Sequence, residues 1–339
     1  MKTTDFAECL STYLTMYLPG EAGLSGNTIM SYRDTFKLVL LFAKEQRGLS
    51  PEKITLNEFN SGFTATFLSW LEENRVCSTS TRNNRLAALR AFAKYVSLRK
   101  PEYIWEYQKI LDLRFKKNPQ PLLMHLTPDM VKAIMAQPDV GNSYGRRDLA
   151  LLSLMYDAAA RVQEICDMCV GNVRLQKPYA VILTGKGGKA RAVPIMASTA
   201  DVLTKYVSEN RLDEPSRTDY PLFFNHQRHK LTRAGITYIL KKYSDAARKQ
   251  YPGLQKRISP HVMRHSKAMH LLQSGVNLVY IRDFLGHVHV ETTEVYAKAD
   301  TEMRRKSIEQ AQIRIDAELP SWNSDKSLME MLVSLCGKE

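Results

Sequence analysis

Residues 259–265, SPHVMRH, place a histidine and an arginine where they could hold a phosphate. Ser259 is a favourable N-cap and Pro260 suits the first helical position, so the segment predicts the start of a helix. His261 and Arg264 then share one face of its first turns. Free backbone N–H groups and the positive end of the helix dipole lie there too, which favours a bound anion. Taken alone, the segment favours a solvated His and Arg, because such pairs are common on helices.

A second segment, FLGHVHVETTEVYAK at 284–298, contains a candidate nucleophile. Its Leu-Gly pair at 285–286 predicts the end of a helix, and His287 follows directly. Tyr296 stands nine positions after that histidine. A tyrosine hydroxyl becomes a nucleophile once its proton is removed in a cationic setting, although a lone tyrosine is ordinarily a packing residue.

Two further segments, DAAARVQE at 157–164 and TGKGG at 184–188, precede these in the chain. The order and spacing of all four resemble the tyrosine recombinase (phage integrase) family, in the style of Xer and transposon-encoded recombinases, over nearly the whole chain. That family uses an arginine in an R-x-x-E helix, a lysine in a hairpin turn, H-x-x-R, a histidine or tryptophan after L-G, and a tyrosine nine residues later. The matching residues are Arg161 with Glu164, Lys186, His261, Arg264, His287 and Tyr296.

The sequence departs from the family pattern in two places. The usual T-G-L before the first arginine is Ala158-Ala159-Ala160, and Lys298 replaces a frequent histidine two positions after the tyrosine. Neither departure touches a matched catalytic side chain, so both concern the subfamily.

The resemblance implies a site-specific DNA recombinase that cleaves and rejoins duplex DNA through a 3′-phosphotyrosine. Tyr296 would be the nucleophile. Attack on a phosphodiester concentrates charge on its nonbridging oxygens, and Arg161 and Arg264 would neutralise that charge. Arginine suits the role because it stays charged and presents a planar fork to two oxygens.

Proton transfer would fall to the other matched residues. A phenol with an ordinary pKa of about 10 needs a base, for which His261 is expected. Lys186, on a glycine-flanked turn, would protonate the leaving 5′ oxygen, with Lys189 as the alternative. His287 would hydrogen-bond the phosphate and support Tyr296. A phosphotyrosyl bond retains the energy needed for rejoining, so neither ATP nor a metal cofactor is expected.

Metal and disulfide chemistry find little support in the sequence. The histidines near the candidate site lack the carboxylates or cysteines of a recognised ligand spacing. The five cysteines are scattered, and the CxxC at 166–169 has no second pair, which favours free thiols in a reducing compartment. The histidines considered are His261, His265, His287 and His289.

Hydrophobic spacing predicts a helical core-binding (SAM-like) domain over 1–114. Apolar residues recur at three- and four-residue intervals, the pattern of amphipathic helices. The KKNPQP stretch then predicts a linker over 115–124. Thr127 and Pro128 predict the N-cap and first residue of the next helix. The expected N-terminal helices are 27–46, 56–73 and 79–97.

The second domain, 125–320, is expected to hold the tyrosine-recombinase catalytic fold. Two β-branched runs around GKGGK predict a hairpin over 179–195, among helices. The fold class is therefore mainly α with a small antiparallel sheet, in two domains. The expected helices are 147–157, 197–209, 231–249, 260–274 and 277–284.

Charge points to a polyanionic partner. The chain has 48 Lys and Arg against 35 Asp and Glu, a net charge of +13, and double-stranded DNA leads over an anionic membrane. No signal-like start or run of membrane length is evident, so a cytoplasmic protein is expected. Candidates for contacts with the DNA backbone are Arg82, Arg85 and Lys94, which can face outward on their helix, and Lys189 and Arg191 in the hairpin.

The tail, 321–339, contains SLMEMLVSLC at 327–336, whose apolar residues form one stripe of a short helix. Docking in cis on its own domain is the simpler interpretation. In resembling proteins such a helix packs on the next protomer, and we favour docking in trans within a homotetramer on DNA. A second recombinase could share that complex. Two other functions stay open: type IB topoisomerase-like relaxation, and a catalytically idle DNA-binding accessory protein.

Overall fold

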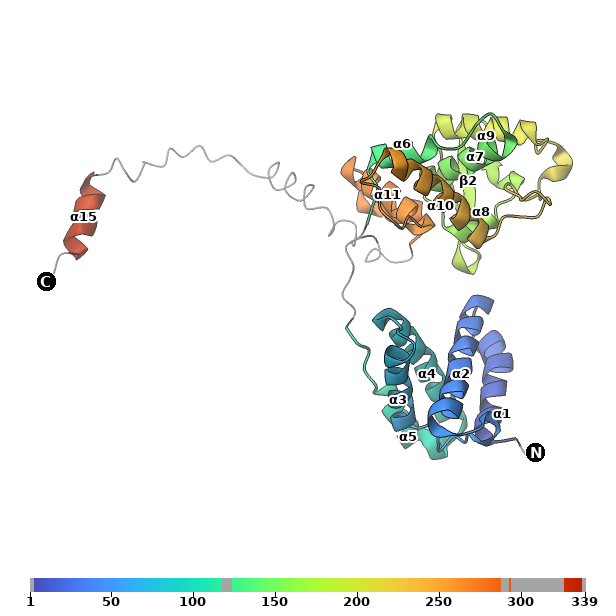
Figure 1. Cartoon of the computed structure of the whole chain (residues 1–339), viewed down its shortest axis with the longest axis vertical. Helices are drawn as coiled ribbons and strands as arrows, with labels where there is room; N and C mark the ends of the chain where they lie inside the picture. Colours follow the sequence, from blue (N-terminus) through green and yellow to red (C-terminus); the bar gives the residue numbers. More distant parts are fainter. Residues whose placement is uncertain (1–2, 118–123, 288–292, 294–325, 337–339) are drawn as a thin grey trace. The chain divides into compact units, whose positions relative to one another are not determined.

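The computed structural model describes residues 3–117, 124–287, 293 and 326–336 (Figure 1). Contacts divide the chain into two compact units, residues 1–121 (unit 1) and 122–339 (unit 2). Each unit has its own hydrophobic core. The predicted fold class, two domains that are mainly helical with a small antiparallel sheet, is confirmed.

Unit 1 is helical, and side chains cap the first turns of α1, α2, α3 and α4. The Ser25 and Ser78 hydroxyls accept from backbone N–H groups in the first turns of α2 and α4. The predicted helices 27–46 and 79–97 are confirmed. The predicted helix 56–73 begins too early, and residues 56–60 are not helical. The Asn60 side chain caps α3, so the helix starts at Ser61. The elements are α1 (Asp5–Thr12), a π-helical segment η1 (Tyr13–Glu21), α2 (Gly26–Arg47), α3 (Ser61–Glu73), α4 (Thr79–Arg99) and α5 (Ile104–Leu111).

Aromatic rings from distant segments fill the core of unit 1. Phe92 of α4 lies at the centre, with its ring centroid 5.0 Å from that of Phe36 and 5.2 Å from that of Tyr13. Four of the five ring pairs that Phe92 makes among the described residues meet edge to face, which aromatic quadrupoles favour. The core joins α1, α2 and α4 around the loop that carries Phe59.

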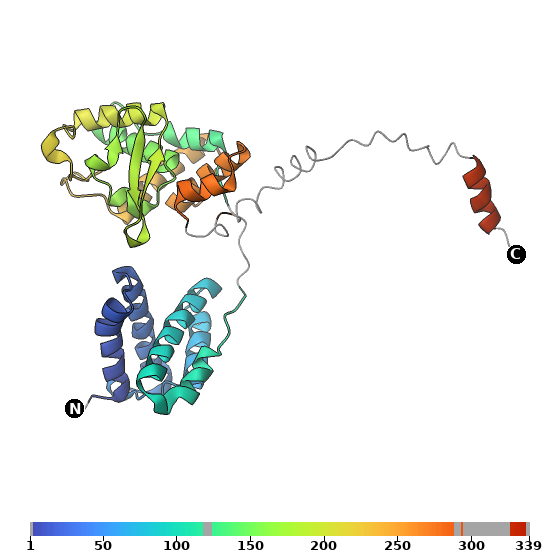
Figure 2. The same ribbon diagram turned by 180° about the vertical axis from the view of Figure 1, so that it is seen from behind.

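Unit 2 surrounds a three-stranded antiparallel sheet with helices (Figure 2). Thr127 caps α6 and Pro128 is its first residue, as predicted. The predicted hairpin is confirmed as β2 and β3, in which Leu183 pairs with Arg191. The elements are α6 (Pro128–Met135), α7 (Ser143–Asp157), α8 (Val162–Cys166), β1 (Val173–Arg174), β2 (Ala180–Thr184), β3 (Ala190–Pro194), α9 (Ala197–Glu209), α10 (Arg233–Gln250), α11 (Pro260–Gln273) and α12 (Leu278–Leu285).

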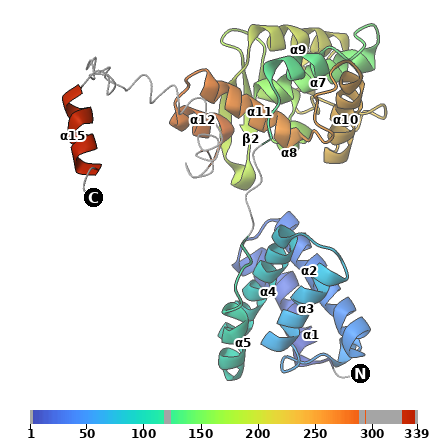
Figure 3. The same cartoon turned by 60° about the vertical axis from the view of Figure 1, so that its left-hand side comes forward.

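A small hydrophobic cluster packs α12 against α11, and the two helices lie side by side in Figure 3. Met269 and Leu272 of α11 meet Ile281 and Leu285 of α12, and all four are buried. Ala159, which follows α7, completes the cluster. The cluster therefore brings the end of α12 to the start of α8.

The predicted tail helix is present as α15 (Lys326–Cys336). Met331, Leu332 and Leu335 on it are exposed apolar side chains. Within the described ranges, no helix combines the length and the apolar character that crossing a membrane requires.

Candidate active site

Arginines from two distant segments meet at the end of α12. Arg264, buried in the second turn of α11, donates to the Ala159 carbonyl at 2.6 Å and to the Leu285 carbonyl. Arg161, at the N-cap of α8, donates to the neighbouring Gly286 carbonyl at 3.2 Å. Both arginines of the predicted set are thus held on consecutive carbonyls, directly before the predicted histidine of the site.

A buried carboxylate orients Arg161. Glu164 is 3% exposed, and its oxygens accept from the Arg161 backbone N–H at 2.8 Å and from Arg161 Nη1 at 2.9 Å. The same oxygens accept from both terminal nitrogens of Arg191, at 2.8 and 2.9 Å. Burial acts to raise the pKa of Glu164, but the hydrogen bonds from Arg191 and Arg161 outweigh it and lower that pKa. Glu164 is therefore an ionised anchor for two guanidinium groups.

Arg191, a predicted candidate for a DNA-backbone contact, is instead directed into the protein. Its side chain is 14% exposed, and besides Glu164 it contacts the Phe284 carbonyl through Nε at 3.1 Å. The strand pattern could have indicated this, because Arg191 is two residues before the buried Val193 and alternate residues share one face. Nothing in the sequence indicated that three arginines contact the consecutive carbonyls of Phe284, Leu285 and Gly286.

The half-buried His287 lies next to these arginines. Its Nδ1 is 3.1 Å from the Thr293 hydroxyl. Burial, and after it the nearby Arg264 and Arg161, lower the pKa of His287 to about 4. The ring is therefore neutral near pH 7, with one nitrogen able to donate and the other to accept.

His261 and His265 lie one turn apart on α11. The His261 ring is exposed, and its centroid is 6.4 Å from that of His265. The pKa of His265 is lowered by burial and then by His261 and Arg264. Among the residues that the structure describes, no three His, Cys, Asp or Glu side chains are grouped to hold a metal ion.

The hairpin turn between β2 and β3 is formed by Lys186, Gly187 and Gly188. Both glycines have positive φ, +78° and +74°, which other residues rarely adopt. The turn exposes Lys189 at the start of the returning strand. The side chain of Lys186 lies outside the described part of the structure, so the choice between the two lysines stays a prediction.

The predicted nucleophile, Tyr296, lies outside the described residues. The same holds for His289 and Lys298.

Arg82 was expected on the outer face of α4, and this is wrong. It is 9% exposed and donates to the Asn83 side chain and, at 3.3 Å, to the Arg114 carbonyl. The reason is helical spacing: Arg82 is four residues before Leu86, which lies in the core, so both share the buried stripe.

Arg85 and Lys94 lie differently on the same helix. Arg85 is partly buried and donates to the Ser31 carbonyl at 3.0 Å and the Thr35 hydroxyl at 2.9 Å, which ties α4 to α2. Lys94 is exposed, as predicted. Of the expected basic contacts, Lys94 and Lys189 therefore present the more accessible charges.

Hydrogen bonds fix α11 to the first described residues of unit 2. The backbone N–H of Leu126 donates to the Ser266 hydroxyl at 2.8 Å. His270 Nε2 lies 2.8 Å from the Leu126 carbonyl, so that nitrogen donates and Nδ1 accepts from the Tyr156 hydroxyl at 2.7 Å. These bonds join the helix that carries His261 and Arg264 to α7.

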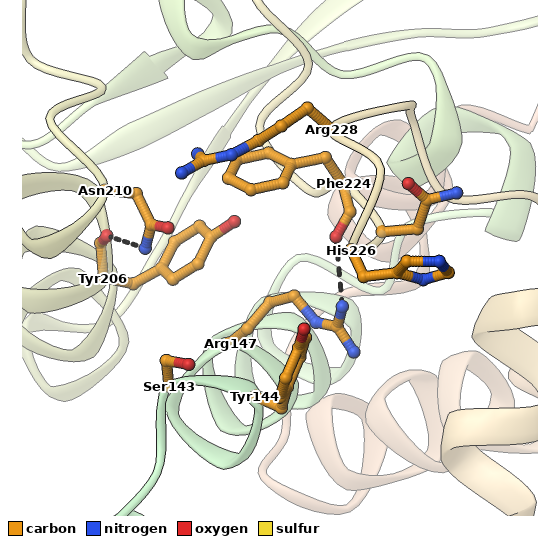
Figure 4. A pocket seen from close by; sticks show the side chains of 9 residues that line it. Ser143, Tyr144, Arg147, Tyr206, Asn210, Phe224, His226 and Arg228 are labelled. Carbon is orange, nitrogen blue, oxygen red and sulfur yellow. Dashed lines mark hydrogen bonds between the residues drawn. The ribbon is translucent and has the colours of Figure 1, made fainter.

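A pocket of about 180 Å³ lies at the N-terminal end of α7, away from these arginines (Figure 4). Arg228 lies over the Phe224 ring there, and Arg147 donates to the Phe224 carbonyl. The Arg147 charge is matched by the adjacent Asp148. None of the predicted site residues lines this pocket, and we assign it no part in the chemistry below.

The comparisons with known proteins cover both units. The family model described as "Phage integrase family" matches residues 124–303, and that described as "Phage integrase, N-terminal SAM-like domain" matches residues 12–100. The chain is 32% identical over 290 residues to tyrosine recombinase XerC of Roseiflexus castenholzii, covering 84% of this chain and 87% of the relative. It is 30% identical over 315 residues to tyrosine recombinase XerA of Pyrococcus horikoshii, covering 91% of this chain and 94% of the relative.

The fold is similar to that of a solved transposon integrase. The Tn1549 transposon integrase, in complex with a circular intermediate DNA, superposes with a TM-score of 0.68 over 91% of this chain and 100% of that one. The sequence identity is 14%, so this likeness concerns the fold.

Proposed function

Because the chain belongs to the phage integrase family, we propose that it is a site-specific recombinase that breaks and rejoins duplex DNA through a covalent bond to Tyr296. The main support is the convergence of Arg161 and Arg264 on the Gly286 and Leu285 carbonyls. Guanidinium groups so oriented can bind the two nonbridging oxygens of one phosphate.

The proposed reaction conserves a phosphate ester at each step. The Tyr296 oxygen attacks phosphorus, and the bond from phosphorus to the 5′ oxygen breaks. His261 accepts the phenol proton, and Lys186 donates a proton to the leaving oxygen. Rejoining reverses these steps with the 5′ hydroxyl of another strand. The 3′-phosphotyrosine retains the bond energy, so the proposed cycle needs neither ATP nor a metal.

His287 fits a hydrogen-bonding role better than a charge role. With its pKa lowered to about 4, it is neutral at pH 7 and can donate from one ring nitrogen to a phosphate oxygen. The positive charge in the proposed site then comes from Arg161 and Arg264, which stay charged at all working pH values.

A nicked suicide substrate tests the proposal. After cleavage the short 5′ fragment diffuses away, so the protein should be trapped as a covalent adduct on the 3′ side that resists denaturation. Tyr296→Phe should abolish the adduct and retain binding. Tight binding by the wild-type protein with no adduct would instead identify a DNA-binding accessory protein.

Two matched variants test the acid. Lys186→Ala should slow adduct formation strongly on an ordinary 5′-oxygen substrate and much less on one with a 5′-bridging sulfur, whose leaving group needs no proton. Lys189→Ala serves as the control and should behave alike on both substrates. The reverse pattern would assign the acid to Lys189.

We also propose a homotetramer on double-stranded DNA in the cytoplasm, with or without a second recombinase, as the working form. The exposed Met331, Leu332 and Leu335 of α15 support docking of the tail in trans on a second protomer. Deleting residues 321–339 should leave binding to a half-site intact and prevent assembly of the synaptic complex, which gel-shift and light-scattering measurements can follow. Efficient relaxation of supercoiled DNA by the monomer would favour a topoisomerase-like activity instead.

A further inference from the structure

We propose that Arg191 is a positioning residue for strand cleavage, which holds Glu164 and the end of α12 so that Arg161 and His287 face the same phosphate. This inference rests on the proposed function. Its basis is a contact between three segments: β3, which carries Arg191, α8, which carries Glu164, and the last turn of α12.

The donor groups of Arg191 are directed inward. Nη1 and Nη2 bind the two oxygens of Glu164 at 2.8 and 2.9 Å, and Nε binds the Phe284 carbonyl at 3.1 Å. The side chain is 14% exposed. This fork-to-fork arrangement is the strong form of an arginine–carboxylate pair, and it orients both partners.

Glu164 transmits that orientation to Arg161. The oxygen that accepts from Arg191 Nη1 also accepts from Arg161 Nη1 at 2.9 Å. The other oxygen accepts from Arg191 Nη2 and from the Arg161 backbone N–H. Without Arg191, the carboxylate would lose one of its two cationic partners and one constraint on its rotation, and Arg161 would lose a fixed anchor.

The second route leads to His287. Arg191 holds the Phe284 carbonyl, while Arg264 and Arg161 hold the next two carbonyls of the chain. The Arg191 guanidinium also packs against Gly286, where an added Cβ would lie 2.9 Å from Nη1. The position of the backbone directly before His287 therefore depends on Arg191.

A direct phosphate contact by Arg191 makes a different prediction. Each phosphate neutralised by a cation makes the slope of log affinity against log salt more negative by about 0.9, so losing a phosphate contact makes that slope shallower by about one. A positioning residue leaves both the slope and the affinity nearly unchanged and slows the chemical step.

The experiment compares full-length wild type, Arg191→Lys and Arg191→Ala on the nicked suicide substrate. We expect the rate of adduct formation at saturating protein to fall at least tenfold in both variants, with DNA affinity within threefold and the salt slope unchanged. Lysine keeps the charge but lacks the planar fork, so it should not restore the rate. An unchanged rate of adduct formation would overturn the proposal. A shallower dependence of affinity on salt, with the saturated rate intact, would also overturn it.

A double variant separates positioning from loss of fold. If Arg191 acts in part through Glu164, then Arg191→Lys with Glu164→Gln should slow the reaction by less than the product of the two single effects, whereas independent effects would multiply. Circular dichroism and thermal unfolding should show each variant folded at the assay temperature, and multiplying effects in folded protein would overturn the proposal. Absence of a Tyr296-dependent adduct in the wild type would refute the proposed function rather than this inference.

Discussion

The Glu164→Gln substitution tests how much the buried carboxylate stabilises unit 2. Both Glu164 oxygens accept hydrogen bonds from arginine N–H groups. In the glutamine variant, the amide NH2 would face arginine N–H groups, which cannot accept a hydrogen bond from it. Removing one partner of a buried ion pair costs about 3–5 kcal/mol. The Arg161 side chain is 35% exposed and can turn to water, so we expect a cost of about 3 kcal/mol in the free energy of unfolding.

Differential scanning calorimetry of the full-length protein measures this loss. For a unit of about 200 residues, a loss of about 3 kcal/mol lowers Tm by about 6–12 °C. Hydrogen exchange of peptides spanning 157–166 assigns the transition to unit 2. The control is Glu209→Gln, which removes a partly exposed partner of Arg146 and should lower Tm by less than about 4 °C. Equal shifts in the two variants would refute the reasoning.

The Tm difference between wild type and Glu164→Gln should depend on pH with a definite sign. The pKa of Glu164 is lowered in the folded protein, so its contribution is fully present above the unfolded pKa of about 4.3 and is lost as pH falls through the folded value. The Tm gap between wild type and Glu164→Gln should therefore be constant from about pH 8 to pH 5 and narrow below about pH 4. A gap that widens in acid would contradict the lowered pKa.

Two backbone substitutions test local geometry in the same calorimetric assay. Gly286→Ala should lower the free energy of unfolding by about 2–3 kcal/mol, because φ is +64° and the new Cβ meets Arg191. The control is Gly275→Ala, where φ is +82° and the space around the new Cβ is open, so strain alone should cost about 1–2 kcal/mol. Equal losses in the two variants would remove the case for the Arg191 contact. Ala159→Gly should change the free energy of unfolding by less than about 1 kcal/mol, because relief of the backbone strain at a φ of +44° offsets the lost methyl burial and the added chain entropy. Its control, Ala158→Gly, is at an ordinary φ of −81° and should cost about 1.5 kcal/mol. A loss as large at Ala159 would show that its backbone is unstrained.

The helices of unit 2 could be predicted closely because their signals are local. The predicted helix 197–209 coincides with α9, and Ser259 and Pro260 begin α11 as expected. These boundaries follow from caps and apolar spacing within a few residues. The tight turn with Gly187 and Gly188 was likewise predictable, since it needs positive φ.

Charged side chains were harder to predict, because their partners come from elsewhere in the chain. Arg82 binds the Arg114 carbonyl, 32 residues away, and Arg191 binds Glu164, 27 residues away. Composition alone suggests that an arginine is solvated. The periodicity of each element did contain the correction, since both residues fall on the buried side of their helix or strand.

The departure at Ala159 was visible in the sequence, but its physical meaning was not. Its left-handed backbone turns the carbonyl toward Arg264, which donates to it at 2.6 Å. Such a conformation suits glycine, the residue that resembling proteins carry there. The tertiary bond to Arg264 and the buried methyl group show why alanine is tolerated.

Three guanidinium groups, those of Arg161, Arg191 and Arg264, meet at the end of α12, where their mutual repulsion opposes the fold. One carboxylate and three carbonyl oxygens at the negative end of the α12 dipole offset part of that charge. The cluster keeps a net positive charge. Screening by salt should therefore stabilise unit 2, and dilute buffer should weaken it.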